Sequence, residues 1–123
     1  MKYLILLLSL TFISCNTYKK KCEYFHNGKF KYISNDGYNW KVSRNDTLQI
    51  EENLDTGELI KGSILWKNPC EYELTFIEFN NLNNNQLLGT KLKVKIIDIK
   101  GKSYKYETRR AGILLENWVT KIK

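Results

Sequence analysis

Residues that could carry out nucleophilic or acid–base chemistry are few in this chain of 123 residues. His26 is the one histidine, and it stands between Phe25 and Asn27, before the first expected strand. Catalysis by a serine or cysteine nucleophile needs such a base within hydrogen-bonding reach. Carboxylate pairs such as Glu71 with Glu73 alternate with apolar residues, as expected on the solvent face of a strand. The sequence therefore predicts a protein that is not an enzyme, with no catalytic residues and no cofactor.

The first residues are typical of an export signal. An apolar run over residues 3–13 is too short to span a bilayer, which takes about 20 apolar residues. The run leads into Ile13-Ser14-Cys15, which resembles a bacterial lipobox, although Phe12 stands where such signals usually have Leu or Val. In these signals the cysteine thiol receives diacylglycerol and the chain is cleaved before it. We expect residues 1–14 to be a lipoprotein signal peptide and Cys15 the lipidation site; an ordinary secretory signal and an uncleaved anchor are the alternatives.

Two cysteines, Cys22 and Cys70, remain once Cys15 is assigned to lipid, and export places them in an oxidising compartment. A disulfide between them would close a loop of 70 − 22, or 48, residues. Chain entropy gives a loop of this length about 4 kcal/mol of stabilisation. Two free thiols or a metal site are the alternatives. No metal is expected, because the chain has a single histidine and no CxxC spacing.

Basic residues outnumber acidic ones, with 20 Lys+Arg against 13 Asp+Glu and a net charge of +7. They are spread along the strands, except for the triplet Lys19-Lys20-Lys21 just after the expected anchor. Lysines beside a lipid anchor lie on anionic headgroups or form a solvated tether. Because export removes the usual nucleic-acid partners, nucleic acid is not expected to bind.

Apolar and polar residues alternate through most of the remaining chain, which is typical of half-buried antiparallel strands. In one such run, Leu48 and Ile50 alternate with Gln49 and Glu51, which places the apolar pair on the expected core face. We expect eight strands, near residues 28–34, 38–44, 46–52, 58–67, 70–79, 91–100, 102–109 and 113–122.

Turn-forming residues stand between these runs, for example Asp36-Gly37 and Lys100-Gly101. Eight short antiparallel strands hide their edges when the sheet closes. The expected fold is therefore all-β, a small antiparallel up-and-down β-barrel over residues 28–123, with an open β-sandwich as the alternative. Residues 15–27 are expected to form the lipidated N-terminus and a tether. A bulge near Ile96-Ile97, or apolar residues on both faces, would explain the broken alternation of the sixth strand.

Aromatic residues make up 13% of the chain and fall mostly on the expected inward face. Those that could line a pocket are Trp40, Trp66, Tyr72, Tyr104, Tyr106 and Trp118. Core packing is one role for them, and an aromatic pocket or barrel mouth for a small apolar or sugar-like ligand is the other. A barrel of eight strands can just hold one small ligand or be filled by its own side chains.

Three segments together resemble a group of small lipoproteins from Bacteroidota: Cys22 with Gly28-Lys29-Phe30, then Arg44-Asn45-Asp46-Thr47, then Ile64 to Leu74 with its W-x-N-x-C-E-Y pattern. The resemblance covers most of the chain after Cys15 and implies no particular activity. Some members carry the name DNA topoisomerase IV, which this chain is far too short to support. The Gly28-Lys29-Phe30 segment also resembles the first-strand G-x-W of lipocalin and calycin barrels, which implies the barrel fold alone.

Asp46-Thr47-Leu48 is similar to the site at which Bacteroidota O-glycosylate exported proteins, which makes Thr47 a candidate for modification.

These features together predict a non-catalytic lipoprotein of the cell envelope, a binding or structural module that could hold a small apolar ligand in its barrel. A periplasmic enzyme inhibitor, or an enzyme acting through surface loops such as residues 80–90, is the alternative. Surface lipoproteins of Bacteroidota often carry acidic residues after the anchor cysteine, whereas Lys19-Lys20-Lys21 is basic, so we expect the outer membrane facing the periplasm. The expected partners are the membrane, through the lipid, and a small ligand or an envelope protein, and the chain is expected to be a monomer.

Overall fold

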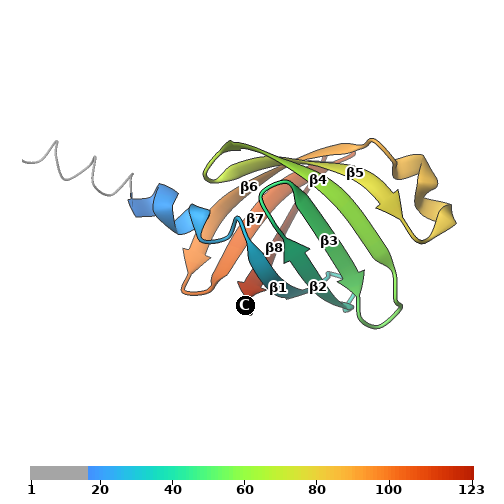
Figure 1. Cartoon of the computed structure of the whole chain (residues 1–123), viewed down its shortest axis with the longest axis horizontal. Coiled ribbons are helices and arrows are strands. Elements are labelled where there is room, and N and C mark those ends of the chain that lie inside the picture. Colours follow the sequence, from blue (N-terminus) through green and yellow to red (C-terminus); the bar gives the residue numbers. More distant parts are fainter. Residues whose placement is uncertain (1–16) are drawn as a thin grey trace, which may run out of the picture.

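A computed structural model describes residues 17–123, so the expected signal peptide and Cys15 lie outside the described residues. Within the described residues, the chain forms a helical segment at residues 17–23, eight strands and one short 3-10 helix (Figure 1). In order they are β1 (Gly28–Ile33), β2 (Asn39–Arg44), β3 (Leu48–Asn53), β4 (Leu59–Asn68), β5 (Glu71–Phe79), η1 (Leu82–Leu87), β6 (Lys91–Lys100), β7 (Ser103–Arg110) and β8 (Ile113–Lys121). Each strand lies within two residues of its expected position. No helix within the described residues is long and apolar enough to cross a membrane.

Every strand pairs with the next one antiparallel, and β1 pairs with β8, so the sheet closes into a barrel. The predicted eight-stranded up-and-down barrel is therefore confirmed, and the open sandwich is not formed. The closing pair is the shortest, since only Phe30 with Lys121 and Lys31 with Thr120 are in register. We call this junction between β1 and β8 the seam.

The bulge expected in β6 is present. The register between β6 and β7 shifts between Ile96 and Asp98, so that Ile97 has no partner residue. The extra residue reverses the alternation, and both Ile96 and Ile99 consequently pack in the core.

The face of β3 was predicted wrongly. Gln49 is only 4% exposed and points into the barrel, whereas Ile50 is 38% exposed and lies on the outside. The reason is the buried guanidinium of Arg44 on β2, which needs a hydrogen-bond acceptor and finds the side chain of Gln49 opposite it. With this register, Glu51 and Asn53 also face inward, so one barrel strand presents a row of polar side chains to the interior.

The segment expected as a tether packs against the barrel from residue 17 onward. Residues 17–23 are helical, and the disulfide between Cys22 and Cys70 fastens them to the β4–β5 turn, which confirms the predicted bridge. Tyr18 Oη donates a hydrogen bond to the Ile96 carbonyl, 3.1 Å away, and the side chain of Phe25 is completely buried. The N-terminal segment therefore plugs one end of the barrel (Figure 1).

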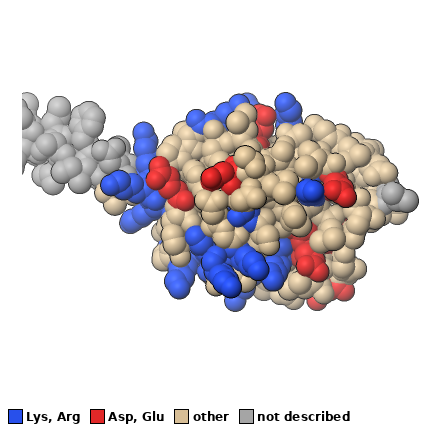
Figure 2. Space-filling model, viewed as in Figure 1, with Lys and Arg blue, Asp and Glu red and all other residues tan. Residues whose placement is uncertain are grey.

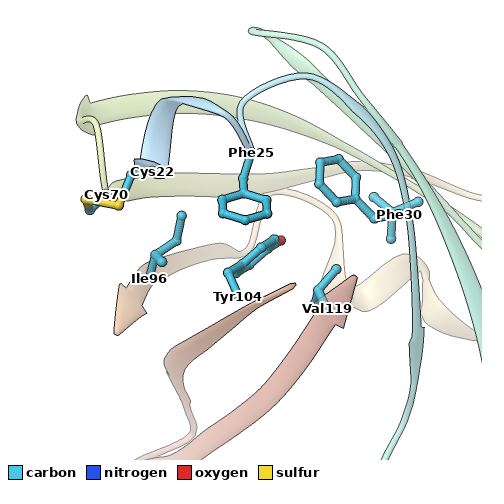
Figure 3. Close-up of a cluster of buried hydrophobic side chains, with 8 residues drawn as sticks. Cys22, Phe25, Phe30, Cys70, Ile96, Tyr104 and Val119 are labelled. Atoms are coloured by element: carbon cyan, nitrogen blue, oxygen red, sulfur yellow. A yellow bond between two sulfur atoms is a disulfide. The ribbon is translucent and has the colours of Figure 1, made fainter. Parts of the chain in front are cut away.

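The two ends of the barrel are thus unlike. We call the plugged end the closed end; it holds residues 17–27, the β2–β3, β4–β5 and β6–β7 turns and the last residues of the chain. The open end holds the β1–β2, β3–β4 and β7–β8 turns together with η1. The buried cluster around Phe25 and Tyr104 lies at the closed end (Figure 3).

Candidate ligand-binding site

The interior next to the closed end is filled by the protein's own side chains. Arg44, 6% exposed, donates from Nε to Gln49 Oε1 at 2.8 Å, from Nη1 to the Phe25 carbonyl at 2.9 Å and from Nη2 to Tyr104 Oη at 2.8 Å. Its guanidinium also stacks over the ring of Phe30, 4.6 Å from the centroid. The charge is therefore satisfied without any ligand.

Arg44 also reaches across the barrel. From β2 it comes within 5.4 Å of the ring centroid of Tyr72 on β5 and within 5.7 Å of that of Tyr104 on β7. On β4, a Cβ added to Gly62 would lie 2.5 Å from Leu74 Cδ1, so even a methyl group would not fit there. This half of the interior has no space for a ligand comparable in size to an aromatic ring.

On β1 and β7, the aromatic side chain in the middle of the barrel is more exposed than the one nearer the closed end. Along β1, Phe30 is fully buried and Tyr32 is partly exposed. Along β7, Tyr104 is buried and Tyr106 is partly exposed. Asn117 on β8, the register partner of Tyr106, is also partly exposed. Side chains in the middle of the barrel therefore reach accessible space on the open side.

A carboxylate lies at this middle level. Tyr32 Oη donates to Glu51 Oε1 at 3.1 Å. Burial raises the pKa of the Glu51 carboxyl above its ordinary value, while the hydrogen bond from Tyr32 and the charge of Arg44 act in the opposite direction. Burial also raises the pKa of Tyr106 to about 12, so its hydroxyl stays protonated at neutral pH.

The seam opens toward the open end into a slot with a volume of about 490 Å³. Beyond its two register pairs, β1 and β8 are bridged by Asn117 Nδ2, which donates to the Ile33 carbonyl at 2.8 Å. The side chains that line the slot are mainly apolar or aromatic: Tyr32, Ile33, Trp40, Leu54 and Trp118.

The walls of the slot are flat and partly uncovered. The rings of Tyr32 and Trp40 are nearly parallel, at an interplanar angle of 4° with centroids 6.1 Å apart. Ile33 and Leu54 beside them are 62% and 57% exposed. Water therefore covers apolar surface that a flat apolar ligand would bury.

A second pocket of about 480 Å³ lies at the open end and shares Trp40 with the slot. Its lining is more polar, with Asp36, Tyr38 and Asn53 among its residues. Asn53 is 2% exposed, and its Oδ1 accepts hydrogen bonds from the backbone N–H groups of Asp55 and Thr56.

The outer face of β5, β6 and β7 forms a larger but charged concavity of about 660 Å³. Its lysines and glutamates pair with one another, as in Lys91 with Glu73 at 3.8 Å and Lys95 with Glu71 at 3.9 Å. These ion pairs agree with the expected position of Glu71 and Glu73 on the solvent face. The lining also contains Lys67, Lys93, Glu107 and Arg109, so the concavity is charged and does not favour an apolar ligand.

The six aromatic residues considered as pocket lining divide into two groups. Trp40 and Trp118 line the slot, and Trp118 does so from the outer face, opposite Lys105 and not inward as expected, because Val119 takes the buried position. Lys100 Nζ lies 5.1 Å from the ring centroid of Trp118. The other four, Trp66, Tyr72, Tyr104 and Tyr106, pack in or against the core clusters.

The residues with chemical potential are engaged in structure. His26 donates from Nε2 to the Pro69 carbonyl at 2.7 Å and stacks on Trp66 with centroids 3.5 Å apart. The indole N–H of Trp66 is buried without a hydrogen-bond partner. Within residues 17–123, no three His, Cys, Asp or Glu side chains are grouped to hold a metal ion. Thr47 lies exposed in the β2–β3 turn.

The sequence did not reveal the site residues Tyr32, Leu54 and Asn117 as a group, because the seam joins the first strand to the last. The polar row of β3 did leave a signal, since Gln49, Glu51 and Asn53 occupy alternate positions. Comparisons with protein-family models, with curated proteins and with solved structures find no match for this chain.

Proposed function

We propose that this protein is a lipid-anchored binding module of the cell envelope that takes a small, flat, apolar ligand in the seam slot. The observation that supports this most directly is the slot itself, where Tyr32, Trp40 and Trp118 gather around open space. The small β-barrel is compatible with such a role.

The size and lining of the slot favour a small molecule. Its volume of about 490 Å³ lies within the usual range of ligand pockets, roughly 300–1,000 Å³. Parallel rings and aliphatic side chains offer dispersion contacts and burial, and the amide of Asn117 at the rim could orient one polar group. A ligand inside the closed half is disfavoured, because Arg44 and its aromatic neighbours occupy that space.

A non-catalytic role is part of this proposal. The one imidazole is held by Pro69 and Trp66, and Cys22 and Cys70 are joined to each other, so neither thiol is a nucleophile. Activation of a hydroxyl nucleophile by His26 would require it to leave these contacts.

The ligand proposal is tested with N-phenyl-1-naphthylamine, a flat apolar dye whose fluorescence rises in apolar surroundings. The variant Trp118→Ala removes one wall from the outside and spares the core. We expect roughly tenfold weaker dye binding, because much of one aromatic contact surface is lost.

Tyr24→Ala is the matched control, since it removes an exposed aromatic side chain at the closed end. Its dye affinity should equal that of the unaltered protein. Equal affinity in the Trp118→Ala variant, or no dye binding at all, would refute the slot as an apolar ligand site.

The anchor is tested separately. Detergent-extracted protein from the native host should begin at Cys15 and carry the mass of diacylglycerol and an N-terminal acyl chain. Cys15→Ala should abolish both modifications. The same mass spectrum would reveal a glycan on Thr47.

Protease treatment of whole cells should leave the protein intact if it faces the periplasm, and its removal would place it on the cell surface.

The pocket at the open end supports a second candidate, a sugar. Tyr38 and Trp40 offer aromatic side chains, and Asp36 and Asn53 in the same lining offer polar groups for sugar hydroxyls. Saturation-transfer NMR with methyl glycosides of glucose, galactose and N-acetylglucosamine tests this. Signal that is lost in Trp40→Leu but kept in Trp118→Ala would locate sugar in this pocket, and no signal from any of them would refute it.

A further inference from the structure

The closed end carries a group of lysines that the ligand slot does not use. We call it the basic rim, and it consists of Lys19, Lys20, Lys21, Lys29, Lys100, Lys102, Lys121 and Lys123. All of them except Lys121 are exposed. Figure 2 shows basic side chains gathered on the N-terminal helix and over the neighbouring part of the barrel.

The basic rim is one continuous surface, although it comes from separate segments. The backbone N–H of Lys121 donates to the Lys102 carbonyl at 2.8 Å, and Lys29 and Lys123 exchange backbone hydrogen bonds of 2.9 and 3.2 Å. Lys121 Nζ donates to the Tyr24 carbonyl at 2.7 Å, which joins the strands to the N-terminal segment. Barrel closure therefore places lysines from distant parts of the sequence side by side.

The positive charge of the rim is not balanced by the protein. The ion pairs found among residues 17–123 involve Lys61, Lys91, Lys95 and Lys105, none of which belongs to the rim. The segments that form the rim contain two carboxylate side chains, Glu23 and Asp98, and the β2–β3 turn at the same end adds Asp46, so three carboxylates face eight lysines. A surface of this kind attracts an anionic partner.

We infer that the basic rim docks on the anionic phospholipid headgroups of the membrane that holds the anchor. The inference rests on the proposed lipidation of Cys15, which stands two residues before the helical segment. Two residues span at most about 7 Å, and the helix is fastened to the barrel by Cys22–Cys70 and by Tyr18.

The start of the helix at residue 17 therefore lies within about one Debye length of the headgroups at physiological salt, and Lys19–Lys21 follow in its next turn. Docking in this direction points the open end, with the slot and the second pocket, away from the membrane. The ligand site would then be accessible from the aqueous phase.

The experiment uses the lipidated protein reconstituted into two kinds of vesicle, one of phosphatidylcholine and one of equal parts phosphatidylcholine and phosphatidylglycerol. Surface lysines are acetylated briefly with an N-hydroxysuccinimide ester, and the label on each lysine is quantified by mass spectrometry. We expect Lys100, Lys102 and Lys123 to react roughly fivefold more slowly on the anionic vesicles, and salt to remove the difference. Lys61 and Lys91 serve as internal controls and should react equally on both.

A variant with glutamine at Lys100, Lys102, Lys121 and Lys123 should lose protection of Lys29, whereas glutamine at Lys31, Lys41, Lys61 and Lys91 should not. Equal labelling of the rim on both vesicles would overturn the inference. The intact mass of the same sample reports lipidation independently. If the chain carries no lipid, the anchor is refuted, and co-sedimentation of that chain with the two vesicle types decides the docking alone.

Discussion

The closed and open halves of this barrel share the same eight strands but use them differently. In the closed half, Arg44, Phe25 and Tyr104 meet in a buried network, and a disulfide fastens the N-terminal segment over it. In the open half, β1 and β8 are no longer paired, and the partly exposed Tyr32 and the edge of the largely buried Trp40 line the slot. One buried cluster thus lies at the closed end, and a second one, which includes Phe76 and Phe79, extends along β5 toward η1.

The difference shows how a domain of about 100 residues can leave apolar surface exposed. Such a domain has a small core and limited stability, so apolar surface left uncovered in an open pocket lowers its free energy of unfolding further. The cross-link and the Arg44 network stabilise the closed half, and this allows the seam to remain loosely joined. Sites that bind ligands are commonly drawn from the less stable parts of a fold.

The largest effect is expected from the disulfide. Replacing both Cys22 and Cys70 with serine should lower the free energy of unfolding by about 4 kcal/mol, because the unfolded chain regains the freedom of a 48-residue loop. Urea unfolding of the two proteins measures this. A loss below about 1 kcal/mol would contradict the view that the closed half carries the stability of the barrel.

A somewhat smaller effect is expected from Arg44→Met. The change leaves Gln49 and the Phe25 carbonyl buried without their donor, and we expect a loss of about 3 kcal/mol. Arg110→Met is the matched control, because Arg110 is exposed at the end of β7 and should stay within about 0.5 kcal/mol of the unaltered protein. Urea unfolding measures both variants. Equal losses of unfolding free energy would contradict the view that the buried network at the closed end contributes more stability than the open end.

The fold could be predicted because its signals are local. In β5, for example, Tyr72, Leu74 and Phe76 alternate with polar residues, and turns such as Lys100-Gly101 mark strand ends, so eight strands followed from short stretches of sequence. Closure followed from the need of short strands to hide their edges. The disulfide could be predicted as well, because Cys22 and Cys70 were the pair left after Cys15.

The site could not be predicted in the same way. The inward face of β3 depends on Arg44 needing Gln49, a contact that outweighs the apolar character of Leu48 and Ile50. The slot depends on how far β1 and β8 overlap, which is a property of the whole closed sheet. Trp118 fell on the outer face because Val119 fills the core position beside Tyr104.

The buried carboxyl of Glu51 in the middle of the barrel should make the stability of the protein depend on pH. Its pKa is raised by burial in the folded chain, so the folded state holds the proton more tightly than the unfolded state. Ionisation of Glu51 therefore costs more in the folded state than in the unfolded state. This cost to the free energy of unfolding is absent below the ordinary pKa of a glutamate and grows as the pH rises from that value to the folded-state pKa. Over this range the unaltered protein should lose stability relative to Glu51→Gln.

Urea unfolding at a series of acidic to neutral pH values measures this difference. Glu52→Gln, on the exposed face of the same strand, is the matched control for the loss of one negative charge. If the free energies of unfolding of Glu51→Gln and the unaltered protein differ by the same amount at every pH, the middle of the barrel is more hydrated than its burial indicates.

The smallest effect concerns the seam. Asn117→Ala removes the side-chain hydrogen bond to the Ile33 carbonyl and should cost about 1 kcal/mol. Asn117 Oδ1 also accepts from the Trp118 backbone N–H, so the opening is read on the other strand. Because β1 and β8 have only two residue pairs in register, the loss should appear as local opening, seen as faster hydrogen exchange along β1 near Lys31. Ser103→Ala is the control, since it removes a side-chain hydrogen bond to Thr120 between β7 and β8 and should leave exchange along β1 unchanged. If Asn117→Ala exchanges no faster at the seam, the seam is as firmly closed as the rest of the barrel, and an apolar ligand would have to enter by way of the open end.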